Sequence, residues 1–202
     1  MPSGGLRSSI TQMSDEARFP RERYERAAAK YRPIKTSVLF VAEAPPSSLD
    51  RYFYFEDVRH QDSLWVELTK EVFGSEAWGN TRRERSRKRE WLRRFQEDGY
   101  QLIDAVKEPL DCADAVTKIK EHSQELISEI REIAPSCVVL LKYAVYDVLF
   151  DELRRAALPV VDRRLPFPGN GWQKKFHSLF PREVLKGRVA TAAAPENPAA
   201  HD

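Results

Sequence analysis

Short, continuous apolar runs alternate with amphipathic segments along the middle of this 202-residue chain. The runs fall at residues 38–41 (VLFV), 100–106 (YQLIDAV), 137–141 (CVVLL) and 159–162 (PVVD). Apolar residues recur at helical spacing at 61–73, 114–133, 143–156 and 172–180, and a shorter helix is expected at 21–31. Continuous runs of this length are typical of strands that are buried on both faces. The alternation predicts an α/β fold in which helices cover both faces of a parallel sheet.

The two ends of the chain lack this pattern. Residues 1–17 are polar, and residues 188–202 are rich in Ala and Pro, so we expect both to be disordered. Residues 18–187 then form a single domain. No apolar stretch approaches the roughly 18 residues that a membrane helix needs, and we expect a cytoplasmic protein. Two cysteines, Cys112 and Cys137, are too few for a four-ligand zinc or iron–sulfur site, so we expect no structural metal.

The net charge of +2 conceals a basic block at residues 82–94, RRERSRKREWLRR, with eight basic and two acidic side chains. A predicted helix presents them, with its apolar side marked by Trp91, Leu92 and Phe95. Such a block attracts a polyanion, because each cation that neutralises a phosphate releases counterions. The alternative is an ordinary solvated helix face. The predicted DNA contacts in this block are Arg82, Arg83, Arg85, Arg87, Lys88 and Arg89.

Ligands of open parallel sheets bind beyond the carboxyl ends of the strands, which selects the loops at 42–57, 107–111 and 163–171. In the first loop, Glu43 directly follows a predicted buried strand, where its carboxylate would be held rigidly at the floor of the crevice. A capping or turn residue is the alternative. Four consecutive aromatics follow at residues 52–55. At least one is expected to be exposed and able to stack on a nucleobase, unless an edge strand packs alternate rings inward.

The third loop, RRLPFPGNGWQKKF, combines cations with prolines and glycines. Its four cations are Arg163, Arg164, Lys174 and Lys175. Glycines let the backbone approach a ligand closely, and the loop opens a helix whose N-terminus favours an anion. A phosphate clamp is therefore predicted, with an ordinary turn as the alternative. His177, on the last helix, is interpreted as a packing or surface residue.

Several of these segments resemble the motifs of the uracil-DNA glycosylase superfamily. VLFVAEAPPSS is similar to its first motif, and LPFPGNG looks like a variant of its His-Pro-Ser-Pro motif. Between them, LIDAVKEPL resembles the base-reading strand and loop, and IAPSCVVLLKYAVYDVL resembles the following strand and helix. The resemblance spans roughly residues 36–180. It implies a three-layer α/β/α sandwich with a four-stranded parallel sheet.

The resemblance also implies roles for particular residues. Glu43 would activate water, Tyr54 or Phe55 would stack on a flipped base, and Asp104 would read that base. The segment Pro166, Phe167, Pro168, Gly169, Asn170 and Gly171 would grip the DNA backbone and enter the duplex. Three positions depart from the family pattern: Leu165 replaces a His, Asp104 replaces an amide and Pro46 replaces a Gly. An ionised Asp104 would suit a base that presents an amino group.

The leading hypothesis is a monofunctional DNA N-glycosylase that removes a damaged or deaminated base. We expect it to work without cofactor or metal, as a monomer, in a cytosol of bacterial type. A catalytically degenerate nucleic-acid-binding protein of the same fold is one alternative. A hydrolase of free nucleosides is the other.

Overall fold

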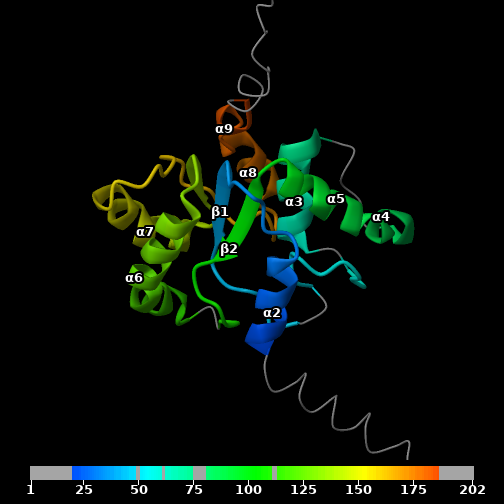
Figure 1. Cartoon of the computed structure of the whole chain (residues 1–202), viewed down its shortest axis with the longest axis horizontal. Coiled ribbons are helices and arrows are strands. Elements are labelled where there is room, and N and C mark those ends of the chain that lie inside the picture. The colour runs from blue at the N-terminus through cyan, green and yellow to red at the C-terminus, as the bar shows by residue number, and fades with distance from the viewer. Residues whose placement is uncertain (1–19, 49–50, 61, 75–80, 111–112, 187–202) are drawn as a thin grey trace, which may run out of the picture.

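The computed structural model describes residues 20–48, 51–60, 62–74, 81–110 and 113–186 (Figure 1). The predicted disordered ends, 1–17 and 188–202, lie outside the described residues. In chain order the elements are α2 (Pro20–Ala29), β1 (Val38–Ala42), α3 (Ser63–Phe73), α4 (Arg82–Ser86), α5 (Lys88–Glu97), β2 (Tyr100–Asp104), α6 (Ala115–Ile133), β3 (Cys137–Leu140), α7 (Tyr143–Arg155), α8 (Gln173–Leu179) and α9 (Glu183–Lys186). The predicted alternation of strands and helices is therefore present.

The three strands form a parallel sheet in the order β2-β1-β3. In its register, Val38 lies opposite Tyr100 on one side and Cys137 on the other. All five residues of the central strand β1 are buried, as a continuous apolar run predicts. Parallel strands that follow one another in the chain need a long crossover connection. Helices α3 to α5 connect β1 to β2, and α6 connects β2 to β3.

Helices cover both faces of the sheet because successive strand residues point to opposite faces (Figure 1). On one face, Phe40 belongs to a core shared with α2, α3, α5 and α8. On the other face, Leu39 and Val41 pack in a second core with α6 and α7. Both faces of this α/β fold are thus sealed, and the ends of the strands are where the sheet meets the loops.

The prediction of a fourth strand at 159–162 is wrong for the described residues, where this segment contributes a single bridge between Val138 and Val160. The backbone turns away on both sides of the bridge. The amide of Val160 donates to the carbonyl of Leu158, and the amide of Arg163 donates to that of Val161. These local bonds use groups that a longer ladder would need.

The basic block also differs from its prediction, because it forms two helices rather than one. Thr81 and Glu84 make a capping box that starts α4. Arg87 then ends α4 and precedes α5, with φ −90° and ψ 0°. The break lets α5 take its own direction along the sheet.

The C-terminus of α7 is a Schellman motif in which alanine occupies the position that usually holds glycine. The amide of Leu158 donates to the carbonyl of Leu153, and the amide of Ala157 donates to that of Arg154. Ala157 has a φ of 57°, whereas the preceding Ala156 has a φ of −78°. Of these two alanines, Ala157 is the one in the left-handed region, where a Cβ is disfavoured.

We expect Ala157→Gly to raise the free energy of unfolding by about 0.5–1 kcal/mol, because it removes the left-handed strain of a Cβ. The neighbouring Ala156→Gly should lower it by a similar amount, because glycine there only adds freedom to the unfolded chain. Urea unfolding of the two variants measures the difference. Destabilisation by both substitutions would contradict the described helix end.

Candidate active site

The carboxyl ends of the three strands meet at one edge of the sheet and present charged side chains there. Asp104 ends β2 opposite Ala42, and Glu43 comes directly after β1. Lys142 follows the end of β3 and precedes α7. Backbone bonds continue past the strands, since the amide of Val106 donates to the carbonyl of Glu43 at 3.0 Å. The backbone that carries these groups is therefore held as rigidly as the sheet.

A pocket of about 650 Å³ opens at this edge, and we call it the Glu43 pocket. This volume is in the range of small-molecule sites. Its lining includes Glu43, Tyr52, Phe53, Asp104, Phe167 and Trp172. The pocket thus brings together the first loop, the end of β2 and the Pro-Phe-Pro turn, as the loop rule predicts.

The two carboxylate oxygens of Glu43 have different surroundings. Oε1 accepts a hydrogen bond from Nζ of Lys142 at 2.5 Å, and the Glu43 side chain is 16% exposed. Oε2 is buried and has no hydrogen-bond partner among the described residues. A buried acceptor without a partner is rare in native structures and is costly. No side chain of the described residues therefore satisfies this oxygen.

Asp104 is buried and lines both the Glu43 pocket and a second cavity of about 530 Å³ beside α2. Burial raises the pKa of Asp104 to about 7, partly opposed by the nearby charge of Lys107. The amine of Lys107 donates to the backbone carbonyl of Asp104 and to the carboxylate of Glu129. Near neutral pH, Asp104 can therefore be either a donor or an acceptor of hydrogen bonds.

The aromatic loop differs from its prediction, because Tyr54 and Phe55 do not line the Glu43 pocket. Tyr54 is buried, and its hydroxyl both donates to the carbonyl and accepts from the amide of Leu102. Since β2 is at the edge of the sheet, Tyr54 satisfies backbone groups that have no neighbouring strand. Phe55 packs against Tyr24, under the guanidinium of Arg23.

Tyr52 and Phe53 line the pocket in their place. Both are almost fully buried in the surrounding core, at 5% and 2% exposure, so only a small part of each ring is accessible. The stacking residues nearest to Glu43 are thus one or two positions earlier in the chain than predicted.

The loop at 166–171 contributes to the pocket as predicted for Pro166, Phe167, Gly169 and Asn170, whereas Pro168 and Gly171 do not line it. A Cβ on Gly169 would lie 2.8 Å from the Phe167 ring, so glycine is needed for this close approach. Phe167 is 38% exposed at the pocket. Leu165, in contrast, is fully buried in the core.

The four cations of the third loop lie on the surface, but two of them are engaged. Arg164 makes two hydrogen bonds of 2.6 Å to Asp147, and its guanidinium lies over the ring of Tyr143. Arg163 lies 3.7 Å from Glu183. Lys174 and Lys175 are exposed, and Lys175 lies over the ring of Trp172. They are the cations of this loop that the structure leaves most open to an anion.

The basic block reaches the same edge of the sheet through the start of α5. Lys88, predicted to contact DNA, is instead buried at 1% exposure, which rules out a surface contact. Its amine donates to the carbonyl of Tyr52 and lies over the ring of Trp65. Burial lowers the pKa of Lys88 to about 7, partly opposed by Asp62. Lys88 therefore fastens the aromatic loop to α5.

The other predicted contacts of the block remain at the surface. Arg82, Arg83, Arg87 and Arg89 are exposed and Arg85 is half-buried. Arg87 pairs with Glu90, and Arg89 lies 3.4 Å from Glu56 of the aromatic loop. Figure 1 shows α4 and α5 on the opposite side of the sheet from α6 and α7.

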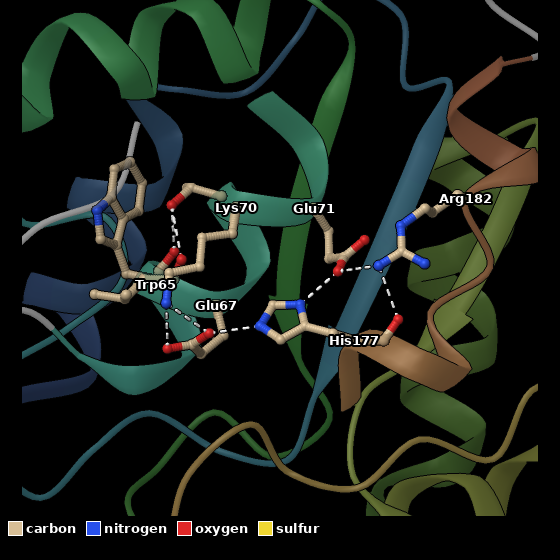
Figure 2. A network of polar contacts seen from close by, with 8 residues as sticks. Trp65, Glu67, Lys70, Glu71, His177 and Arg182 are labelled. Atoms are coloured by element: carbon tan, nitrogen blue, oxygen red, sulfur yellow. Dashed lines mark hydrogen bonds and ion pairs between the residues drawn. The ribbon is translucent and has the colours of Figure 1, made fainter. Parts of the chain in front are cut away.

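His177 does not line the Glu43 pocket but takes part in a polar network between α3 and α8 (Figure 2). Its ring bridges two carboxylates of α3, at 2.7 Å to Glu67 and in a short contact with Glu71. Arg182 also donates to Glu71, and Lys70 pairs with Glu67. The network holds α8 against α3, and Trp172, which lies directly before α8, lines the pocket. The interpretation of His177 as a packing or surface residue agrees with these contacts.

Comparisons with known proteins identify no relative. No protein-family model matches the chain, and no curated protein matches it significantly. None of the helices in the described ranges has the length and apolar character required to cross a bilayer. Within the same ranges, no group of three or more His, Cys, Asp or Glu side chains is placed to hold a metal ion.

Sequence reasoning missed Lys142 and the pocket-lining Trp172. Trp172 is 47% exposed, and its neighbours Pro, Gly and Asn in the loop could have indicated a surface position. The position of Lys142 directly after a predicted buried strand was the available signal. The same rule that selected Glu43 would have selected it.

The raised pKa of Asp104 predicts a pH-dependent stability. In the folded state this carboxyl keeps its proton up to about pH 7, against a reference pKa of 3.8. Its contribution to the free energy of unfolding is therefore present below pH 4 and is lost as the pH rises through 7. We expect this loss to amount to roughly 1–4 kcal/mol and to be absent in Asp104→Asn, measured by urea unfolding between pH 4.5 and 7.5.

Lys88→Met serves as the matched control, because a lowered amine pKa acts in the opposite direction. Stability from Lys88 should increase above pH 7, where the folded state loses its buried charge. The Lys88→Met variant should thus keep the fall below pH 7 and lose only the increase above it. A wild-type profile that is flat from pH 4.5 to 7.5 would contradict the burial of an ionisable Asp104.

Proposed function

We propose that this protein is an N-glycosidic hydrolase of the uracil-DNA glycosylase type, which binds a base in the Glu43 pocket and cleaves its bond to the sugar. The observation that carries the proposal is the buried, unpartnered oxygen Oε2 of Glu43, a residue that lines a pocket together with aromatic side chains. This oxygen would accept a hydrogen bond from a water molecule and direct the water at the anomeric carbon. A fixed carboxylate also stabilises the positive charge that the sugar develops as the base departs.

The walls of the pocket support a flat, polar ligand. Tyr52, Phe53, Phe167 and Trp172 all line the pocket, with small accessible parts of the first two rings and larger exposed parts of the other two. A nucleobase has two apolar faces and a polar edge, so aromatic rings with a few polar groups match it.

The protonation of Asp104 changes the expected choice of base. Because its pKa is about 7, a neutral carboxyl is present below that pH and can donate to a carbonyl oxygen. The ionised form only accepts, and would suit an exocyclic amino group. A uracil-like base therefore remains a suitable ligand, although Asp104 stands where the family has an amide.

Charge supports a polyanionic substrate over a free nucleoside. Lys174 and Lys175 follow the pocket loop on α8, and Arg89 of α5 lies 3.4 Å from Glu56 of the aromatic loop. A phosphate backbone that passes both loops would meet both sets of cations.

We expect purified protein to excise a base from at least one member of an oligonucleotide panel that carries uracil, hypoxanthine, xanthine and alkylated or oxidised bases. Glu43→Gln should lower the rate by about 10²–10⁴-fold, because the amide cannot take the proton from water. Its affinity for the same oligonucleotide should be nearly unchanged. Glu121→Gln, an exposed change on α6, is the control and should retain the wild-type rate.

The outcomes separate the candidate functions. Excision that survives Glu43→Gln would remove this carboxylate from the mechanism. Salt-dependent binding without excision would favour a catalytically degenerate binding protein, an alternative supported by the buried Leu165, which leaves no imidazole at its position. Cleavage of free nucleosides without affinity for oligonucleotides would select the third candidate.

Reversing basic charge tests the nucleic-acid surface independently of catalysis. We expect the triple variant Arg82→Glu, Arg83→Glu and Arg89→Glu to bind duplex DNA more weakly. The slope of log affinity against log salt should become shallower by about 0.9 for each lost phosphate contact.

The control is an equal charge reversal on α6, at the exposed residues Lys118, Lys120 and Arg131. This helix covers the other face of the sheet, so its reversal should change affinity only through the net charge. Equal salt slopes for the two triple variants would show that α4 and α5 make no DNA contact.

A further inference from the structure

Lys142 has an unusual backbone conformation for a residue with a side chain. Besides glycine, four described residues have a positive φ: Ala134 at 48°, Asn170 at 51°, Ala157 at 57° and Lys142 at 89°. The first three lie close to the left-handed helical value of about 57°. Lys142, with a ψ of 139°, lies outside that region as well. Conformations of this kind are strained and cluster at functional sites.

Lys142 is also a poor residue with which to start a helix. It occupies the N-cap of α7, where its side chain makes no capping bond and the first turn contains no acidic residue. Ser, Thr, Asp or Asn would cap the free amides there, and a cation is disfavoured near the positive end of the helix dipole. Two local rules are thus broken at one position, which points to a function for its side chain.

The contact that this side chain makes is with Glu43, 99 positions away in the sequence. Among the described residues that line the Glu43 pocket, Lys142 is the only lysine or arginine. The other titratable groups of the lining are Asp62 at the start of α3, Asp104 at the end of β2 and the phenols of Tyr52 and Tyr143. Lys142 is therefore the one cation in this lining among several acids.

We propose that Lys142 is a positioning residue, whose strained backbone places its amine so that Oε1 of Glu43 is held and Oε2 faces the pocket. This role rests on the proposed function, in which Oε2 orients the attacking water. Without this amine, Oε1 would lose its hydrogen bond and the Glu43 carboxylate would be free to rotate.

The test compares Lys142→Gly with Lys142→Ala, since both remove the amine but only glycine suits a φ of 89°. We expect Lys142→Gly to melt about 2–4 °C above Lys142→Ala. Both should lose about 10²-fold in kcat, because the reacting geometry is no longer fixed, whereas KM for the oligonucleotide should change less than threefold.

Ala157→Gly is the matched control, because it relieves a positive φ at the other end of α7 and should leave kcat unchanged. A readout that needs no substrate is the NMR chemical shift of the Glu43 carboxyl carbon at one fixed pH, which should change in Lys142→Gly because Oε1 loses its hydrogen bond, and should not change in Ala157→Gly. A merely structural lysine would leave kcat unchanged in the better-folded glycine variant.

Wild-type kcat in Lys142→Gly, or an unchanged carboxyl-carbon signal of Glu43, would overturn the inference. If the wild type itself excises no base, the proposed function fails. The melting order and the carboxyl-carbon signal of Glu43 then still decide whether Lys142 holds this carboxylate.

Discussion

The candidate site depends on the hydrogen-bond ladder of the central strand β1. This strand pairs with β2 and β3 along its length, and all of its residues are buried. The ladder continues after the strands end, since the amide of Ala105 donates to Ala42 and the amide of Leu141 donates to Val41. Glu43 and Lys142 are therefore one residue beyond a backbone that cannot move without breaking the sheet. A site of this kind is positioned by strands rather than by mobile loops.

The strands and helices could be predicted because their signals are local. Continuous apolar runs gave β1, β2 and β3, and helical spacing gave α3, α6 and α7 within one or two residues at each end. The segment at 159–162 is also a short apolar run, but only the amide of Val161 donates to β3, at Val138. The amides of Val160 and Arg163 bond to carbonyls two residues earlier, and only tertiary context decides between these partners. A short apolar run therefore predicts burial more reliably than it predicts a ladder.

The buried Lys88 shows how a signal can be present and still be obscured. Lys88, Trp91, Leu92 and Phe95 follow the spacing i, i+3, i+4 and i+7, which is the buried face of α5. Trp91, Leu92 and Phe95 were predicted as the apolar side, but Lys88 was assigned to the charged side with the surrounding arginines. Because a long lysine stem can pack on apolar surface while its amine finds a carbonyl, periodicity was the better guide here than charge.

The residues of the candidate site were predicted only in part. The carboxyl-end rule selected the loop that contains Glu43, since the rule requires only the order of the elements, whereas Asp104 was indicated by the resemblance to the glycosylase motifs. The four consecutive aromatics are divided by the open edge of β2, because Tyr54 bonds there to Leu102 and so does not line the pocket. No local sequence pattern indicates which strand is at the edge of the sheet. The backbone of Lys142 could not be predicted either, because a positive φ at lysine contradicts local preference and is adopted only where the surrounding fold imposes it.

The pocket places two carboxyl groups in contrasting environments. Glu43 lies against the amine of Lys142, whereas Asp104 is buried and the nearby Lys107 donates to its backbone rather than to its carboxyl group. Burial raises the pKa of Asp104 to about 7, so a neutral carboxyl group is present below that pH. Two carboxyl groups with different surroundings take different roles in many active sites. In the proposed reaction, Glu43 would act on the water while Asp104 holds the polar edge of the base, and neither group could replace the other.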